Sequence, residues 1–233
     1  MSKPVCVVAG VGEGNGAALA RAFSKEGMAV ALLARGTGFT SALAGELPGS
    51  RAYACDVTDP ESVRATFASI RSELGDPATV VYNAGSGVWG DVESIDLDGF
   101  ESSWRVNAYG ALAVSQAAIP AMQAAGRGNI LFIGATASRR GGPRTAAFAP
   151  AKAAQRSLAE SMARTLWPQG IHVSLIVIDA VVDLPRTREN MPDKPDEFFL
   201  KPDDMAASAV WLAQQPRSAW TFEIDVRPFG EKW

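Results

Sequence analysis

Short apolar runs alternate with longer amphipathic stretches along most of this sequence. Apolar runs bounded by glycine, proline and polar residues predict buried β-strands, and the stretches between them have the spacing of amphipathic helices. The predicted strands are residues 5–9, 29–34, 51–55, 79–83, 129–133, 173–178 and 222–226. The predicted helices are approximately residues 15–26, 59–74, 99–125, 146–167 and 203–215. This alternation is typical of βαβ units, which build a parallel sheet with helices on both faces.

No internal repeat, low-complexity tract or linker interrupts this order. At 233 residues the chain is long enough for one core, so we expect a single doubly wound α/β domain over residues 1–233. Residues 58–61 (TDPE) predict a capping box, in which Thr58 and Glu61 each serve a free amide of the first helical turn. The one irregular stretch is 183–202, rich in proline and charge, which we interpret as a substrate lid loop rather than a plain connection.

The composition excludes several classes of protein. The chain is 47% hydrophobic and 20% charged, with a net charge of −3 and scattered basic residues, so we expect no nucleic-acid partner. No apolar run approaches the ~20 residues of a spanning helix, and no signal-peptide pattern precedes the first strand, so we expect no membrane association and a cytoplasmic location. Cys6 and Cys55 fit small buried thiols, and the single histidine, His172, fits a packed or edge-strand residue, so we expect no metal site.

A glycine-rich turn, residues 10–16 (GVGEGNG), joins the first predicted strand to an apolar helix. Gly10 permits a tight turn, Gly14 allows the backbone to approach a pyrophosphate, and Gly16 allows close packing of the helix. The helix N-terminus offers free amides and a positive dipole to an anion. The turn therefore predicts a phosphate-binding site of the Rossmann type.

Four further motifs follow in order: Asp56-Val57, Asn83-Ala84-Gly85, Asn107 and Lys152. Together with the G-x-x-x-G-x-G turn they resemble the short-chain dehydrogenase/reductase family along nearly the whole chain. The resemblance implies that Asp56-Val57 contacts adenine, that Asn83 steadies the sheet, that Asn107 supports a proton relay, and that Lys152 holds the nicotinamide ribose. It also implies a homodimer or homotetramer, assembled through the two long helices and the C-terminal segment.

The end of the second strand bears on the choice of cofactor. NAD-binding relatives carry an acid there, which bonds the ribose hydroxyls, whereas this chain has Ala34 followed by Arg35. An arginine can pair with the 2′-phosphate of NADP, so NADP(H) is favoured and NAD(H) stays possible. Glu13 in the turn argues the other way, because it would repel that phosphate.

The catalytic end departs from the family. The tyrosine that delivers a proton to the substrate oxygen stands four residues before the lysine, and that position is Phe148 here. The position of the substrate-binding serine is Ala135, and Thr136 could replace it only if the turn were re-aimed; otherwise its hydroxyl serves the local backbone. We expect Phe148 to face the nicotinamide as an apolar wall.

Three hypotheses follow from the absence of the family's tyrosine and serine at these two positions. The first, which we favour, is an NADP(H)-dependent oxidoreductase acting on a small carbonyl or imine. Its proton would come from Lys152, Thr136, Asp179 or water, or would not be needed for a cationic iminium. The second is a catalytically silent NADP(H)-binding sensor or regulatory subunit. The third is a scaffold for a partner protein, suggested by the C-terminal aromatic residues Trp211, Trp220, Phe222, Phe229 and Trp233.

The expected site residues fall into two groups. The cofactor is expected to contact Gly10, Gly12, Gly14, Asn15, Gly16, Ala34, Arg35, Asp56, Val57, Asn83, Ala84, Gly85, Lys152 and Val181. The catalytic end is expected to consist of Asn107, Lys152, Thr136 and Phe148.

Overall fold

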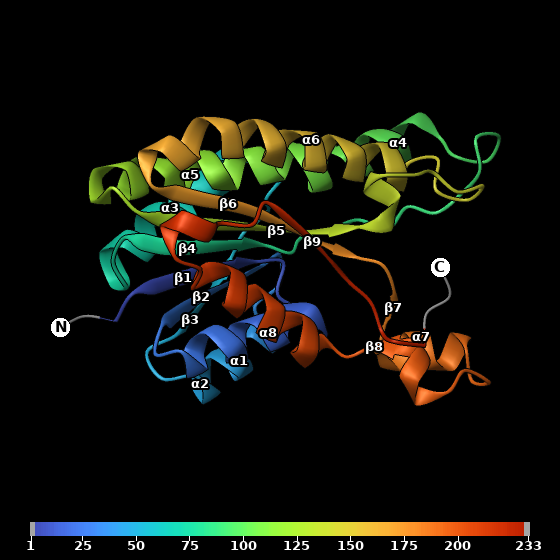
Figure 1. The fold of residues 1–233 in the computed structure, drawn as a ribbon, viewed down its shortest axis with the longest axis horizontal. Helices are drawn as coiled ribbons and strands as arrows, with labels where there is room; N and C mark the ends of the chain where they lie inside the picture. Colours follow the sequence, from blue (N-terminus) through green and yellow to red (C-terminus); the bar gives the residue numbers. More distant parts are fainter. Residues whose placement is uncertain (1–2, 231–233) are drawn as a thin grey trace.

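The computed structural model describes residues 3–230, and in that range it contains one seven-stranded parallel sheet (Figure 1). The strand order is β3-β2-β1-β4-β5-β6-β9. Its strands are β1 (Val5–Ala9), β2 (Ala29–Ala34), β3 (Arg51–Ala54), β4 (Pro77–Tyr82), β5 (Gly128–Ala135), β6 (Ile171–Ile178) and β9 (Glu223–Val226). The predicted fold class is confirmed.

Helices cover both faces of this sheet (Figure 1). One face carries α1 (Asn15–Lys25), α2 (Gly38–Glu46) and α8 (Pro202–Ala213). The other carries α3 (Pro60–Glu73), α4 (Leu97–Trp104), α5 (Gly110–Ala125) and α6 (Phe148–Leu166). Two layers of helices around one sheet give the chain two apolar cores.

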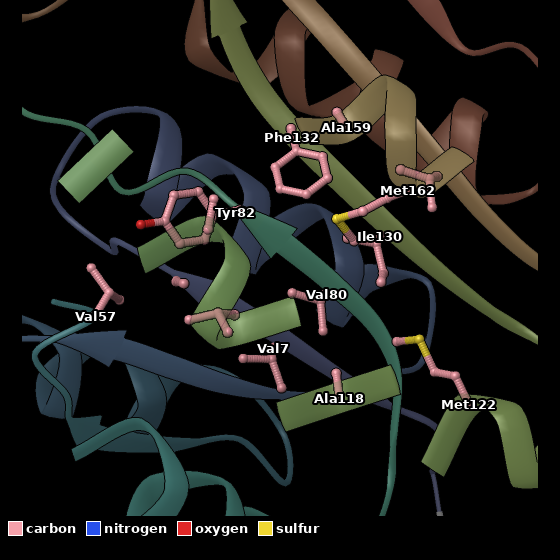
Figure 2. Close-up of a cluster of buried hydrophobic side chains, with 14 of the residues drawn as sticks. Val7, Val57, Val80, Tyr82, Ala118, Met122, Ile130, Phe132, Ala159 and Met162 are labelled. Carbon is pink, nitrogen blue, oxygen red and sulfur yellow. The ribbon is translucent and has the colours of Figure 1, made fainter. Parts of the chain in front are cut away.

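The alternation of side chains along the strands divides residues between these cores. In β1, Val7 and Ala9 face the core under α3, α5 and α6, whereas Cys6 and Val8 face the core under α1 and α8. Figure 2 shows part of the first core, where Val7 and Val80 lie among residues of the neighbouring strands and helices. Because both faces are buried, the central strands read as continuous apolar runs in the sequence.

Three local predictions were wrong. Helix α2 was not predicted, because its sequence (GFTSALAGE) is weakly amphipathic and glycine-rich. The predicted helix 99–125 begins earlier, at Leu97, and is divided by a π-helical segment, Arg105–Tyr109. The capping box at residues 58–61 does not form: the cap of α3 is Asp59, whose carboxylate accepts from the Glu61 amide, while the Thr58 hydroxyl donates to Asp56.

The stretch 183–202 is not an irregular loop. It contains α7 (Pro185–Asn190) and β8 (Phe199–Leu200), and β8 pairs with β7 (Val181–Val182) in a small second sheet. Arg188 holds the segment together, with its guanidinium 2.7 Å from Asp183 and 2.6 Å from Asp196. These hydrogen bonds from Arg188 hold the pKa of the Asp183 carboxyl below its usual value. The positive charge of Arg188 is therefore already paired with two carboxylates, and it is not available to an anionic substrate.

Of the described C-terminal aromatic residues, Trp220 and Phe222 pack within the fold, whereas Trp211 and Phe229 are 54% and 91% exposed. Trp220 stacks on His172 with ring centroids 4.8 Å apart and meets Trp167 edge-on. His172 is buried in β6, between β5 and β9, so the edge-strand alternative is wrong. Its Nε2 lies 2.9 Å from the Thr221 carbonyl oxygen, and burial lowers its pKa. Trp233 lies outside the described residues.

Candidate active site

The glycine-rich turn follows β1 at the carboxyl edge of the sheet, where the strand order reverses between β1 and β4. Gly10 has a φ of 89°, and a Cβ there would collide with the backbone of Ala84. A Cβ at Gly16 would lie 2.6 Å from the Cα of Val11. These contacts leave no room for side chains, so both glycines are required for the turn to approach its neighbours.

Asn83 connects this turn to the next strand. Its side-chain Nδ2 donates to the carbonyl oxygen of Gly10 at 2.7 Å, and its main-chain amide donates to Ala9 at 2.9 Å. The two hydrogen bonds join the ends of β1 and β4 at the reversal point, which is where such folds bind ligands.

A cavity of about 1010 Å³ opens along this edge of the sheet. Its walls come from the glycine turn, the ends of β2, β3 and β4, the π-helical segment and the residues after β6. The lining residues are Gly10, Val11, Gly12, Gly14, Asn15, Gly16, Leu33, Ala34, Arg35, Gly36, Cys55, Asp56, Val57, Thr58, Asn83, Ala84, Gly85, Ser86, Ser102, Arg105, Val106, Val182 and Leu184. Most of the expected cofactor residues therefore share one cavity.

Val181 is not among these lining residues. Its neighbour Val182 lines the cavity instead, because successive side chains of an extended segment point to opposite sides. Leu184 was also not predicted, and its side chain rests so closely on Gly14 that a Cβ there would collide with it. The segment after β6 thus reaches the glycine-rich turn.

One end of the cavity carries the charged groups expected to select the cofactor. Arg35 is exposed and, within residues 3–230, makes no hydrogen bond or ion pair. Asp56 accepts from the Thr58 amide at 2.9 Å and from its hydroxyl at 2.7 Å, and these bonds lower the pKa of the carboxyl. Glu13 is exposed and does not line the cavity. Among the described residues that line the cavity, Arg35 is the one cation that is free to meet a phosphate, because Arg105 donates to the Thr58 carbonyl oxygen.

Asn107 lies in the π-helical segment, and its side chain is buried. Its Nδ2 donates to the carbonyl oxygens of Ser103 at 2.8 Å and Ser86 at 3.2 Å, and its Oδ1 has no hydrogen-bond partner within the described residues. Single π-helical turns are frequent at functional sites. The sequence signalled Asn107 but not this turn, because an extra residue in a helix leaves no local pattern.

Lys152 projects from α6 toward the end of β5. Its Nζ donates to the carbonyl oxygen of Ile133 at 2.9 Å and to Oε1 of Gln155 at 3.1 Å. Burial lowers the pKa of this ammonium to about 7, since no carboxylate of the described residues pairs with it. A lysine in this environment can hold or release a proton near neutral pH.

The missing side chain of Gly85 leaves a gap between the cavity and Lys152. Gly85 lines the cavity, and a Cβ at this glycine would lie 3.8 Å from Lys152 Nζ and 3.4 Å from Asn107 Oδ1. A side chain there would block the gap between the two groups. Lys152 and Asn107 do not line the cavity themselves, so Gly85 marks where they approach it.

Phe148 begins α6 one turn before Lys152. The centroid of its ring lies 6.0 Å from Lys152 Nζ and 4.9 Å from the ring of Trp89. Trp89 is 57% exposed, which makes it an apolar surface beside Phe148 that the sequence did not point to. No hydroxyl stands at this position to exchange a proton with the lysine.

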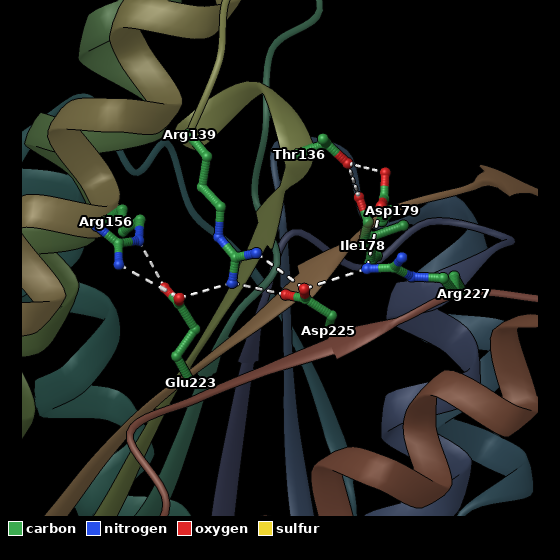
Figure 3. Close-up of polar contacts among 8 residues, drawn as sticks. All are labelled: Thr136, Arg139, Arg156, Ile178, Asp179, Glu223, Asp225 and Arg227. Carbon is green, nitrogen blue, oxygen red and sulfur yellow. Dashed lines mark hydrogen bonds and ion pairs between the residues drawn. The ribbon is translucent and has the colours of Figure 1, made fainter. Parts of the chain in front are cut away.

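Thr136 belongs to a separate network of hydrogen bonds and ion pairs, which Figure 3 shows. Its Oγ1 lies 2.5 Å from Oδ1 of Asp179 and 3.2 Å from the carbonyl oxygen of Ile178. Asp179 also forms an ion pair with Arg227, at 3.2 Å. The threonine therefore fixes the turn after β5 to the end of β6, and both side chains already have partners.

The same network continues to α6. Asp225 pairs with Arg227 at 3.2 Å and with Arg139 at 2.7 Å, and Glu223 pairs with both Arg139 and Arg156 at 2.6 Å (Figure 3). The chain of ion pairs thus connects β9, the turn after β5, and α6, which carries Lys152. Its members stabilise the frame of the site, and among the described residues no group of His, Cys, Asp or Glu could hold a metal ion.

A family model described as enoyl-(acyl carrier protein) reductase matches residues 10–224, most of the chain. The chain belongs to the short-chain dehydrogenase/reductase family. Two curated proteins are similar to this chain over most of its length. D-threitol dehydrogenase of Mycolicibacterium smegmatis is 28% identical, and the match covers 90% of this chain and 85% of that protein. Inactive 2-(S)-hydroxypropyl-CoM dehydrogenase 2 of Xanthobacter autotrophicus is 30% identical, and the match covers 83% of this chain and 90% of that protein.

Among solved structures, the alcohol dehydrogenase of Thermococcus sibiricus complexed with 5-hydroxy-NADP superimposes with a TM-score of 0.87. It is 26% identical and covers 98% of both chains. The protein is thus an oxidoreductase of the short-chain dehydrogenase/reductase type. Within the described residues no helix is long and apolar enough to cross a membrane.

Proposed function

We propose that this short-chain dehydrogenase/reductase transfers a hydride between NADP(H) and a small carbonyl or imine substrate in a site that lacks a tyrosine. The observation that carries the proposal is one cavity with a free arginine at the end of β2 and a buried lysine of lowered pKa behind Gly85. The dinucleotide would supply the hydride, and the chain would supply its binding, its orientation and the proton.

The residues present fit such a cofactor. Gly12, Gly14 and Asn15 line the cavity at the start of α1, whose N-terminus attracts the negative charge of a pyrophosphate. Ala34 leaves space beside Arg35, and no acid follows β2 to repel a 2′-phosphate. The Thermococcus relative with its bound 5-hydroxy-NADP supports the same assignment.

Changing Arg35 to alanine is expected to weaken NADPH binding by about 10- to 100-fold, because a charge-assisted contact to phosphate is worth about 1.5–3 kcal/mol. NADH binding should change by less than about threefold, since NADH has no 2′-phosphate. Fluorescence titration of each cofactor measures both values. Arg64→Ala is the matched control, because Arg64 is exposed and pairs with Glu61 in α3, away from the cavity. Equal losses for NADPH and NADH would contradict the assignment.

The proton would come from Lys152. An ammonium has three protons, and the carbonyl of Ile133 and the amide of Gln155 accept two of them. The third can reach a substrate oxygen through a water at the gap beside Gly85. Reduction of a carbonyl then consumes one hydride and this proton, whereas a cationic iminium takes the hydride alone.

Single-turnover oxidation of NADPH against panels of carbonyls and imines tests the function, with Lys152→Ala as the comparison. We expect carbonyl reduction to weaken above a pH of about 7, where Lys152 loses its proton, and iminium reduction to keep its rate. Tight NADPH binding without oxidation in either panel would overturn the proposal and favour a silent NADP(H)-binding regulator.

We further infer that the chain assembles as a homodimer or homotetramer. Leu97, Phe100 and Trp104 follow one face of α4, and their exposed fractions are 85%, 41% and 42%. Exposed apolar stripes of this kind are typical of interaction surfaces. Light scattering of the purified chain tests the assembly.

A further inference from the structure

A buried glutamine touches both groups behind the gap at Gly85. Gln155 lies three residues after Lys152 on α6, so the two side chains share one face of the helix. Its Oε1 accepts from Lys152 Nζ at 3.1 Å, and its Nε2 donates to the main-chain carbonyl oxygen of Asn107 at 3.0 Å. Its exposed fraction is 0%. Both polar ends of one side chain are therefore used on the expected catalytic residues.

The amide is costly in this position unless both ends are satisfied. Burying an amide without hydrogen-bond partners destabilises the fold, whereas an aliphatic side chain would fill the same space without that cost. The neighbouring positions of α6 that face inward are small and apolar, among them Ala151 and Ala159. The glutamine is therefore explained by its two hydrogen bonds, one to Lys152 and one to the main chain of Asn107.

We propose that Gln155 is a positioning residue that joins Lys152 to the π-helical segment of Asn107 and leaves the third ammonium proton directed at the gap beside Gly85. The inference rests on the proposed function, because it gives Lys152 the task of supplying the proton. Gln155 acts through Lys152 and does not contact the cavity.

The surroundings of Lys152 make this contact decisive for its charge. The titratable residues on the elements around it are Tyr82 of β4, Asp98 and Glu101 of α4, Arg105 and Tyr109 of the π-helical segment, His172 of β6, and Arg156, Glu160 and Arg164 of α6. Glu160 and Arg164 pair with each other. Arg156 is paired with Glu223, Arg105 donates to the Thr58 carbonyl oxygen, and the Tyr82 hydroxyl donates to Val106. Strand β5 has no ionisable side chain. Within the described residues, Gln155 is the side-chain acceptor of the Lys152 ammonium.

Two substitutions separate positioning from packing. Gln155→Met keeps the length of the side chain and removes both hydrogen bonds, so the ammonium loses an acceptor and the Lys152 pKa should fall by about one unit. Gln155→Glu places a carboxylate beside the ammonium and should raise the Lys152 pKa by about one unit or more. The pH at which carbonyl reduction weakens is expected to move in the same two directions.

The measurement is an NMR pH titration of protein labelled with ε-¹³C-lysine, in which the Lys152 signal is the one missing from Lys152→Met. Ser115→Ala is the control, because Ser115 is equally buried on α5 and bonds only the Ala111 carbonyl at 2.7 Å. It should lower stability and leave the Lys152 titration unchanged.

Opposite shifts in the Met and Glu variants support the positioning role. Unchanged Lys152 titration in both variants, with a loss of stability like that of Ser115→Ala, would overturn it. If Gln155→Met does not fold, the rise in the Lys152 pKa that is expected for Gln155→Glu tests the positioning role by itself. The titration needs no turnover, so an absence of NADPH oxidation in the native protein would reject the proposed function and still leave this inference tested.

Discussion

Tyrosine in place of Phe148 is expected to increase carbonyl reduction by NADPH by about 10²–10⁴-fold, the usual worth of one general acid. The new phenol would stand one helical turn before Lys152, whose Nζ is 6.0 Å from the present ring centroid. A nearby ammonium lowers the pKa of a phenol and so makes it a better donor near neutral pH. Single-turnover rates with one carbonyl and one iminium substrate measure the effect.

Two controls make this expectation specific. The double variant Phe148→Tyr with Lys152→Met should lose most of the gain, because the phenol then has no cation beside it. Phe148→Leu keeps an apolar side chain and should give no gain. The iminium rate should stay within about threefold of the native rate, since its reduction needs no acid. A gain of equal size for both substrates would mean that the hydroxyl acts by binding and not by protonation.

Lys152 should make the stability of the protein depend on pH. Its pKa is lowered from 10.5 to about 7 by burial, so between these values the unfolded chain binds more protons than the folded one. The free energy of unfolding should therefore rise with pH across this window, by up to about 1.4 kcal/mol per pH unit. Below pH 7 the penalty for burying the charge is present in full.

Lys152→Met removes this dependence. We expect the variant to be more stable than the native protein at pH 6, by an amount on the order of 4 kcal/mol, with the difference shrinking toward pH 10. Urea unfolding at pH 6, 7, 8 and 9 measures it, with Lys25→Met as control, because Lys25 is exposed at the end of α1. Parallel pH curves for native protein and Lys152→Met would show that the ammonium is not desolvated.

Local patterns predicted the fold and most of the residues that line the cavity. Continuous apolar runs predicted the central strands, because the middle of a parallel sheet that is covered on both faces needs apolar residues at every position. The glycine turn was predictable for a similar reason: Gly10 has a φ of 89° and Gly16 packs against the nearby Val11, and both follow from the local course of the backbone. The lack of a hydroxyl at residue 148 also follows from the sequence, since a phenyl ring has no proton to exchange wherever it lies.

Other features depend on contacts between distant segments. The partners of Thr136 come from the end of β6, and the partners of Lys152 come from β5 and from Gln155. Helix α2 and the π-helical turn have weak local signals and are stabilised by packing and by hydrogen bonds within the fold.

The amino-acid sequence by itself determined the strands of the main sheet, the glycine turn and the absence of a hydroxyl at residue 148, because each depends on residue type and near neighbours. Only the tertiary structure decided the charge of Lys152, the engagement of Thr136 and the place of Gln155. Desolvation and side-chain hydrogen bonding are set by what surrounds a group in three dimensions, and segments about 20 to 50 residues apart supply those surroundings here.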